Sequence, residues 1–326
     1  GSHTVVELQK NGYDVIIADN LVNSSLDVLD GIEKITGIRP DFEEIDLTDR
    51  EVTRDFFARH SDIRAVIHFA ALKAVGESVN KPLEYYFNNL NSLMNVLTCM
   101  REFRVPNLVF SSSCTVYGQA DVLPVTEKTP RHEAESPYGN TKVMSEDIIR
   151  DLMRVEPDMR ALALRYFNPI GAHPTAFIGE LPNGVPNNLI PYLTQTAIGI
   201  REQLSVFGDD YNTPDGSPLR DYIDVVDLAQ AHVVAIRRLL EGKNKENYEF
   251  FNIGTGKALS VLEIIHAFER ATGVKVNYKI VGRRAGDIEK VWADTTLANN
   301  ELGWKAVTPI EETLANAWKW QRTLDK

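Results

Sequence analysis

Apolar and polar positions follow two different patterns in the two halves of the chain. In the first half, short apolar runs predict β-strands at 13–18, 42–46, 65–69, 108–111 and 161–166. Amphipathic stretches between them predict helices near 4–10, 24–35, 49–59, 82–103 and 138–155. Strand–helix alternation of this kind predicts a doubly wound, Rossmann-type α/β fold, in which a parallel sheet is covered by helices on both faces.

From about residue 169 the pattern changes to clusters of Pro, Gly and Asn, shorter elements and longer loops. Helical periodicity returns near 187–199, 226–241, 261–272 and 309–324. We therefore expect a Rossmann domain over 1–168 and a smaller α/β lobe, mainly over 169–326, with some of its segments returning to the first domain.

The predicted helix 82–103 carries two apolar stripes, whereas a helix that packs on one sheet needs only one. One stripe runs from Leu83 to Leu97 and the other from Leu93 to Phe103. The presence of an additional stripe favours a subunit contact, shared with the helix near 138–155, in a four-helix bundle about a two-fold axis. The alternative is a helix buried on both sides within one chain.

Composition narrows the class of protein. The chain has 326 residues, of which 43% are hydrophobic and 25% charged, and its net charge of -11 disfavours nucleic acid or an anionic membrane as the main partner. Its two cysteines, Cys99 and Cys114, have no metal-ligand spacing, so we predict no metal site and a reducing compartment. Without an apolar run of about 18 residues or a signal-peptide pattern, we expect a cytoplasmic protein.

A serine-rich strand end and a downstream Tyr-Lys pair are the main chemical candidates. Ser113 ends the serine run, and Tyr138 and Lys142 are four residues apart, so they share one face of a helix. A hydroxyl, a phenol and an ammonium could then converge on one substrate oxygen, with the ammonium lowering the pKa of the phenol so that it can act as a base. The alternative is a surface tyrosine and lysine on an amphipathic helix.

A dinucleotide site is indicated by the acidic end of the strand at 13–18. Asp19, followed by Asn20, suits a ribose 2′-hydroxyl and repels the additional phosphate of NADP, which favours NAD. The glycine-rich turn that normally precedes such a residue is almost absent. The residues Gly-Ser-His at 1–3 are either a tag remnant or, as we favour, begin with Gly1 as the last glycine of that turn, in which case roughly a dozen residues are missing.

Further cofactor candidates stand at other strand ends, where open α/β sheets bind ligands. Asp46 and Leu47 suit the adenine edge, and Phe69 and Lys73 lie near the expected pyrophosphate. Taken singly, each has a simpler interpretation as a helix cap or a solvated loop residue.

Several segments together resemble one family. They are 69–78, 111–118, 136–139, 165–169, 186–189 and 220–223. On these segments the chain resembles, over essentially its whole length, the UDP-galactose 4-epimerases, which belong to the extended short-chain dehydrogenase/reductase family. The resemblance implies an NAD that stays bound. It also implies that Tyr138 takes the proton of the sugar O4, that Ser113 hydrogen-bonds O4, and that Lys142 holds the nicotinamide ribose.

The resemblance also implies the binding residues. Towards NAD it adds Asn23, Asn88, Ser111 and Tyr166 to the candidates above. Towards a UDP-hexose it implies Lys73, Ser113, Cys114, Thr115, Tyr138, Tyr166, Asn168, Asn188, Leu189, Ser205, Val206, Phe207, Arg220, Arg284, Asp287 and Val291. Judged from the residues alone, the pair at 283–284 would be a solvated basic pair, and the pair at 187–188 a turn or helix cap.

Departures from the family pattern bear on specificity. Cys114 replaces the usual alanine, and Asp224 stands where many relatives carry histidine. Val291 occupies a position where some relatives carry a tyrosine that narrows the pocket. The smaller valine leaves volume for an N-acetyl group, which predicts activity on UDP-N-acetylhexosamines as well as on UDP-galactose and UDP-glucose.

Two alternatives are weighed against the epimerase. A nucleotide-sugar 4,6-dehydratase needs an Asp-Glu pair just after the active-site hydroxyl, where this chain has Cys114 and Thr115. A non-catalytic NAD-sensing protein on the same fold would have no reason to keep Ser113, Tyr138 and Lys142 together. Both are disfavoured.

Overall fold

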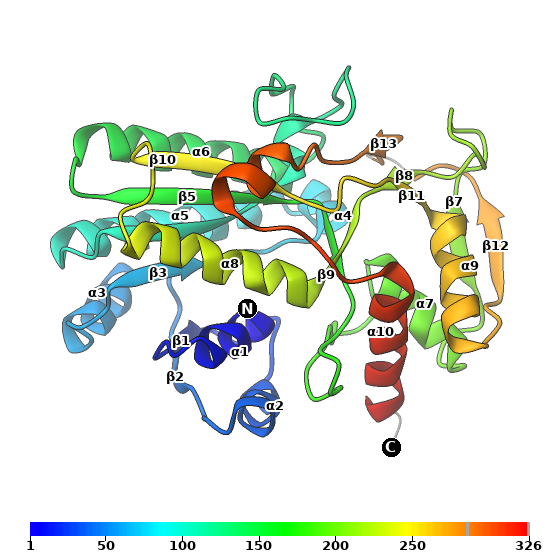
Figure 1. Ribbon diagram of the computed structural model, residues 1–326, viewed down its shortest axis with the longest axis horizontal. Coiled ribbons are helices and arrows are strands. Elements are labelled where there is room, and N and C mark those ends of the chain that lie inside the picture. Colours follow the sequence, from blue (N-terminus) through cyan, green and yellow to red (C-terminus); the bar gives the residue numbers. More distant parts are fainter. Residues whose placement is uncertain (285–286, 325–326) are drawn as a thin grey trace.

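The computed structural model describes residues 1–284 and 287–324, and two of its parallel sheets are formed mainly by the first half of the chain (Figure 1). One pairs β1 (Ile16–Asp19) with β2 (Asp41–Glu44). The other has the order β10-β5-β4-β3, built from β3 (Ala65–His68), β4 (Asn107–Ser113), β5 (Arg160–Tyr166) and β10 (Tyr248–Ile253). These parallel strands therefore lie in two separate ladders. The ladder bonds of β1 go to β2, and within the described chain none joins β1 to β3.

Helices cover both faces of the four-stranded sheet, as predicted. The strand residues alternate, so that Val109 and Leu162 face a core with α1 (Ser2–Lys10) and α8 (Val225–Leu240), whereas Phe110 faces one with α5 (Pro82–Glu102) and α6 (Pro137–Val155). Figure 1 shows α8 and α1 on the side of the strands away from α6. Each helix buries its apolar stripe against the pleated face that it covers.

Local sequence signals explain where these helices begin and end. The Asp49 carboxylate caps α3 (Arg50–Arg59) by accepting from the amides of Glu51 and Val52, and Ser136 caps α6 by accepting from Gly139. The helix α2 (Asp27–Thr36) ends at Gly37, whose φ of 77° favours glycine. The short α4 (Val75–Asn80) and the 3₁₀ turn η1 (Cys114–Tyr117) were not predicted, because they are too brief to show a period.

Part of the second half returns to the first sheet. β10 pairs with β5 from Tyr248–Ala161 to Ile253–Tyr166, and α8 packs on β4 and β5. The π-helical turn η2 (Ala298–Leu302) also contributes to this core.

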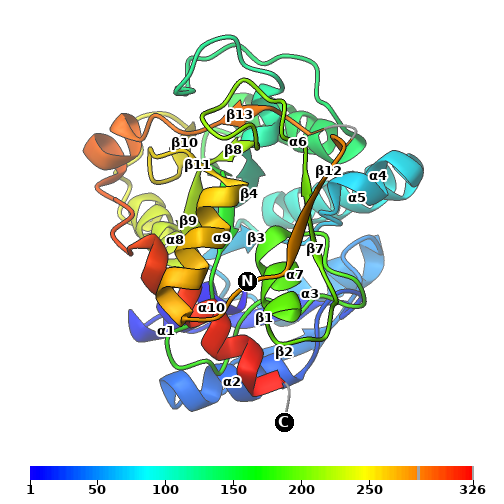
Figure 2. The same ribbon diagram turned by 90° about the vertical axis from the view of Figure 1, so that its right-hand side faces the viewer.

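The remaining segments build the smaller lobe (Figure 2). Its elements are β6 (Asn168–Ile170), α7 (Leu189–Ala197), β7 (Leu204–Phe207), β8 (Leu219–Arg220), β9 (Tyr222–Asp224), β11 (Leu259–Ser260), α9 (Val261–Thr272), β12 (Tyr278–Val281), β13 (Lys290–Val291) and α10 (Ile310–Leu324). Its core is centred on Leu193, Ile264, Phe268 and Leu314. Within the described ranges, no helix has the length and apolar character needed to cross a membrane.

Asp224, one of the residues that depart from the family pattern, joins α8, which packs on the four-stranded sheet, to α10 of the smaller lobe. Its carboxylate caps α8 by accepting from Val226 at 2.7 Å, and it also accepts from the hydroxyl of Thr313 on α10 at 2.8 Å. Burial raises the pKa of this carboxyl, while the bond from Thr313 acts in the opposite direction. The aspartate therefore fixes the start of α8 against the last helix.

The two stripes of α5 have different environments. Leu93, Val96 and Met100 are almost fully buried under the sheet. On the other stripe Leu83 is 77% exposed and Phe87 63% exposed. The alternative of a helix buried on both sides within one chain is therefore wrong for this part of α5.

Candidate active site and cofactor pocket

Ser113, Tyr138 and Lys142 lie at the junction of β4 and α6. Ser113 is the last residue of β4, and Tyr138 is the second residue of α6, just after the Ser136 cap and Pro137. The Lys142 ammonium is buried and donates to the main-chain carbonyl of Ser111 at 2.6 Å. It lies 5.8 Å from the centre of the Tyr138 ring. The predicted spacing on one helix face thus places the phenol and the amine beside the serine strand end.

The electrostatics of this group differ from the prediction. Burial raises the pKa of Tyr138 to about 12; the Ser113 hydroxyl beside the phenol acts against this rise. Burial also lowers the pKa of Lys142 to about 8, against the attraction of Glu146. The prediction that Lys142 lowers the pKa of the phenol is wrong for the protein groups alone, since desolvation dominates and the ammonium is directed at a carbonyl. The Ser113 hydroxyl nevertheless lies close enough to the phenol to influence its pKa.

A buried ionic network supports the site and was missed from the sequence. Glu146, one turn after Lys142, accepts from Arg165 on β5 at 2.9 and 2.6 Å and from the Ser112 hydroxyl at 2.5 Å. Arg131 also donates to this carboxylate. Burial alone would raise the pKa of Glu146, but the bond and charge of Arg165 hold it below its ordinary value. The sequence signal was the spacing of Tyr138, Lys142 and Glu146 on one helix face.

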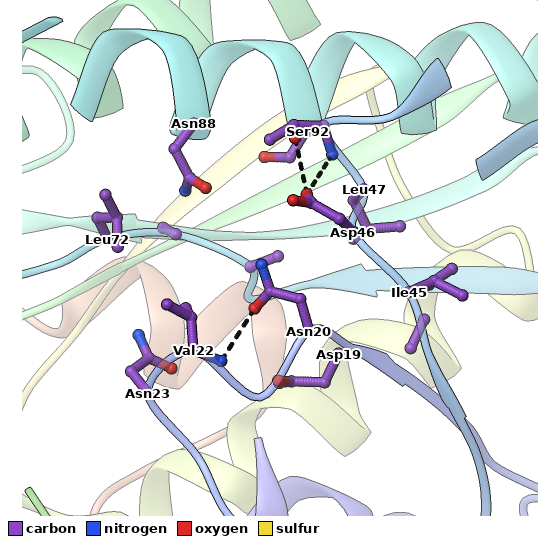
Figure 3. A pocket seen from close by; sticks show the side chains of 14 residues that line it. Asp19, Asn20, Val22, Asn23, Ile45, Asp46, Leu47, Leu72, Asn88 and Ser92 are labelled. Carbon is purple, nitrogen blue, oxygen red and sulfur yellow. Dashed lines mark hydrogen bonds between the residues drawn. The ribbon is translucent and has the colours of Figure 1, made fainter. Parts of the chain in front are cut away.

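A pocket at the carboxyl ends of β1, β2 and β3 gathers six of the predicted cofactor residues (Figure 3). It is lined by Ala18, Asp19, Asn20, Val22, Asn23, Ile45, Asp46, Leu47, Thr48, Ala70, Ala71, Leu72, Asn88 and Ser92. Loop 70–72 is fixed by Asn89 of α5, whose side chain accepts from the Leu72 amide at 2.8 Å and donates to its carbonyl at 3.0 Å. Asp19, Asn20, Asn23, Asp46, Leu47 and Asn88 therefore face one cavity, as expected for residues at strand ends.

The chemistry of this pocket fits an adenosine ribose without a 2′-phosphate. Asp19 accepts from the Leu21 amide at 2.7 Å and from the Ser24 hydroxyl at 2.9 Å, both through Oδ1. Its Oδ2 makes no hydrogen bond within the described chain and can accept from a sugar hydroxyl. A carboxylate at this place repels a phosphate. The pocket therefore fits NAD better than NADP.

Other predicted cofactor residues lie beside this pocket rather than in its lining. Gly1 precedes α1, and a Cβ on it would lie 4.0 Å from Phe69 at the end of β3. Lys73 follows in the loop after β3, while Ser111 and Tyr166 lie at the ends of β4 and β5. These residues continue the row of strand ends from the Asp19 pocket towards Tyr138.

A second group of predicted residues lies in the smaller lobe. Arg284 pairs with Asp287 at 2.7 Å, and the Arg284 guanidinium lies 5.4 Å from the centre of the Phe207 ring. Arg220 approaches the same Asp287 at 3.9 Å. Two arginines therefore meet beside an aromatic face, an arrangement suited to a nucleoside diphosphate. Val206 is different, because its side chain is fully buried in the lobe core and only its main chain can reach a ligand.

The remaining sugar-side candidates lie around β6, α7 and β13. Asn168 begins β6, directly after Phe167, and Asn188 precedes Leu189 at the start of α7, where its side chain donates to Glu180 at 2.6 Å. Val291 of β13 is buried in a cluster with Cys114 and Phe167. Thr115 of η1 has a buried hydroxyl that makes no hydrogen bond within residues 1–284 and 287–324, and Ser205 of β7 is half-buried.

Comparison with known proteins places the chain in a family. The profile of the NAD dependent epimerase/dehydratase family matches residues 1–254. The chain is 50% identical over 321 residues to the UDP-glucose 4-epimerase of Bacillus subtilis, covering 98% of this chain and 93% of that protein. The chain belongs to the NAD dependent epimerase/dehydratase family, and the prediction of a Rossmann-type α/β fold is confirmed.

Solved structures of similar proteins support the same family assignment. A UDP-glucose 4-epimerase from Stenotrophomonas maltophila, with bound NAD and formylated UDP-arabinopyranose, matches with a TM-score of 0.96 and 47% identity, covering 100% of this chain and 95% of that one. A UDP-glucose 4-epimerase from Bifidobacterium longum, in complex with NAD+ and UDP, matches with a TM-score of 0.94 and 46% identity, covering 99% and 95%.

Proposed function

We propose that the protein interconverts UDP-galactose and UDP-glucose, in galactose metabolism, by inverting C4 of the hexose through a 4-keto intermediate with tightly bound NAD. Family membership and near 50% identity to UDP-glucose 4-epimerases support this proposal. The observation that carries it is the meeting of the Ser113 hydroxyl with the Tyr138 phenol, beside the buried ammonium of Lys142. This group can hold one sugar oxygen and accept its proton.

The proposed roles follow from this geometry. Bound NAD would supply an acceptor and donor of hydride at sugar C4, and the reaction would be redox-neutral because the hydride is returned in the same cycle. Tyr138 accepts the O4 proton and later returns it, while Ser113 hydrogen-bonds O4. Lys142 contacts the nicotinamide ribose from its position on the Ser111 carbonyl. The NAD site comprises Gly1, Asp19, Asn20, Asn23, Asp46, Leu47, Phe69, Lys73, Asn88, Ser111, Tyr138, Lys142 and Tyr166.

The substrate would lie between the strand ends and the smaller lobe. Arg220 and Arg284 would pair with the diphosphate, Asp287 with the uridine ribose, and the segment of Ser205, Val206 and Phe207 with uracil. The hexose would contact Lys73, Cys114, Thr115, Tyr166, Asn168, Asn188, Leu189 and Val291, together with the reactive group. Release of Arg284 from Asp287 would then accompany binding of the diphosphate.

The direct test is to incubate the full-length protein, with its NAD, with UDP-galactose and to separate the products. We expect a mixture of UDP-galactose and UDP-glucose. A 4-keto-6-deoxy product would instead identify a dehydratase. No turnover and no transient absorbance of reduced NAD would identify a non-catalytic NAD-binding protein and contradict the proposal.

Val291 leads to a prediction about the substrate range. We expect the wild-type protein to epimerise UDP-N-acetylglucosamine as well, and we expect Val291→Tyr to lower that activity at least about tenfold, with a smaller effect on UDP-galactose. Overpacking by the larger ring costs about 1–3 kcal/mol, so thermal unfolding must be followed in parallel. No turnover of the acetylated sugar by the wild-type protein, under conditions where UDP-galactose reacts, would rule out the wider substrate range.

We also infer a homodimer through α5 and α6. The exposed apolar residues Leu83, Phe87 and Met94 recur along one face of α5, and Met144 and Val155 recur along α6. Contiguous apolar faces of this kind mark protein interfaces. A second copy about a two-fold axis would cover both helices at once.

Phe87→Glu is expected to convert the dimer to a monomer, because it places a charge in an apolar contact. Sedimentation or light scattering measures the mass directly. Val307→Glu is the matched control, since Val307 is 72% exposed and lies before α10, away from α5 and α6. A wild-type protein that is monomeric at micromolar concentration, or a Phe87→Glu variant that stays dimeric, would contradict the proposed interface.

The compartment we infer is the reducing cytoplasm. Cys99 and Cys114, the only cysteines of the sequence, are both free thiols. Burial raises the pKa of Cys114 to about 12, which keeps the thiol protonated and poorly reactive.

A further inference from the structure

A buried histidine lies behind the predicted nicotinamide end of the cofactor site. His232, in the middle of α8, is fully buried, and its Nδ1 lies 2.9 Å from the main-chain carbonyl oxygen of Leu228. Its Nε2 is hydrogen-bonded to the hydroxyl of Tyr166. The rings of Phe69 and Tyr166 lie 4.8 and 5.3 Å from the imidazole, centre to centre. The histidine therefore joins α8 to the ends of β3 and β5.

The partners of His232 determine its tautomer. Burial lowers the pKa of this imidazole to about 3, so the ring is neutral and has one donor and one acceptor nitrogen. The carbonyl of Leu228 can only accept, so Nδ1 carries the hydrogen and Nε2 does not. The hydroxyl of Tyr166 must therefore donate its only hydrogen to Nε2.

The next group towards the reactive serine and tyrosine is the Ser111 hydroxyl, and its hydrogen points the same way as that of Tyr166. Burial raises the pKa of Tyr166, and the Ser111 hydroxyl beside the phenol acts against this rise. Because Tyr166 gives its hydrogen to His232, its oxygen can only accept from Ser111. Tyr166 lies opposite Ser113 in the register of β4 and β5. The phenol also lies close enough to Tyr138 that the phenolate of one would repel the phenolate of the other. The hydrogens of both hydroxyls thus point away from the site, towards α8, and Ser111 and Tyr166 offer lone pairs only.

We propose that His232 is a positioning residue that makes the Ser111–Tyr166 end of the cofactor site an acceptor-only surface, which selects a cofactor ring bearing an N–H donor. The inference rests on the proposed function, because it assigns that donor to the carboxamide NH2 group of nicotinamide. A carboxamide held by its NH2 group cannot rotate to present its carbonyl oxygen to the same surface. His232 would thereby fix which way the amide faces without touching the reacting atoms.

The test compares NAD with its analogue 3-acetylpyridine adenine dinucleotide, in which a methyl ketone replaces the carboxamide and no N–H donor remains. The dissociation constant of each nucleotide follows from the rise of the unfolding midpoint of the full chain with nucleotide concentration. We expect the wild-type protein to prefer NAD by about 3- to 10-fold, the effect of one net hydrogen bond. His232→Phe keeps an aromatic ring but frees the Tyr166 hydroxyl, so the preference should fall to within about twofold.

A double-mutant cycle separates positioning from a general loss of packing. If His232 acts through Tyr166, His232→Phe should change the preference little in a Tyr166→Phe background. His232→Gln provides an amide oxygen that can accept from Tyr166, so it should restore part of the preference for NAD. The same measurement on His232→Gln tests the inference if His232→Phe does not fold.

Equal affinity of the wild-type protein for the two nucleotides would overturn the inference, and so would an unchanged preference in His232→Phe. Binding of neither nucleotide would instead contradict the proposed function. The two failures are therefore distinguishable without measuring turnover.

Discussion

Tyr138→Phe is expected to lower the rate of UDP-galactose epimerisation by about 10³-fold, because it removes the group that accepts and returns the O4 proton while keeping the ring. The phenol of Tyr138 lies beside the Ser113 hydroxyl at the start of α6, where the ring packs beside Lys142. Loss of one oxygen leaves this packing intact. The measurement is the initial rate of UDP-glucose formation, with the NAD content and the unfolding midpoint compared in parallel.

Tyr86→Phe is the matched control. Its phenol accepts from the Asn140 side chain at 2.8 Å, so it contacts the same turn of α6 without joining the serine and lysine group. We expect the control to keep most of its activity. A Tyr138→Phe protein that keeps more than about a tenth of the wild-type rate would rule out the phenol as the main proton acceptor.

The pH dependence of turnover should carry the signature of the same phenol. Burial raises the pKa of Tyr138 to about 12, so with protein groups alone the phenol is protonated at neutral pH. The cationic ring of bound NAD+ adds a positive charge that lowers this pKa. The deprotonated, basic form increases with pH, so we expect wild-type turnover to rise on the alkaline side. The residual activity of Tyr138→Phe should lack this rise.

The helices and strands of the first half were predictable because each has a local period. The predicted helix 138–155 corresponds to Pro137–Val155, and the predicted strand 161–166 to Arg160–Tyr166. The pairing of β10 with β5 could not be predicted from the sequence of either strand. Its partner β5 is more than 80 residues away in the chain, and no local pattern encodes such a pairing.

The candidate site likewise contains residues that the sequence could predict and residues that it could not. Asp19 and Asp46 were found because strand ends of a parallel sheet meet at one edge, a rule that needs only the order of elements. The pKa of Tyr138 was predicted in the wrong direction, because sequence spacing shows a neighbouring charge but not the extent of burial. Glu146 and His232 looked like ordinary polar positions on amphipathic helices, and only their burial and their partners on β5 distinguish them.

Glu146→Gln is expected to destabilise the protein by about 3–5 kcal/mol at pH 7, because it leaves the buried guanidinium of Arg165 without its counter-charge. Arg165 is 2% exposed and Glu146 fully buried, so water cannot replace the lost interaction. The pKa of Glu146 is held below its ordinary value in the folded protein. The stability that it contributes is therefore complete above the unfolded-state pKa of about 4.3 and is lost as the pH falls through the folded-state pKa.

Urea unfolding of the wild-type and Glu146→Gln proteins at pH 7 and near pH 4 measures this difference and its decrease with acid. Glu43→Gln is the matched control, since Glu43 also accepts two bonds from an arginine, Arg59, but that arginine is 54% exposed. An exposed pair contributes about 0–1 kcal/mol, so the control should change little. Because Glu146 also holds Ser112, next to the Ser111 carbonyl that fixes Lys142, the variant should lose activity even where it remains folded. A Glu146→Gln protein as stable as the control would show that Arg165 finds another partner, and that this network does not hold β4, β5 and α6 in register.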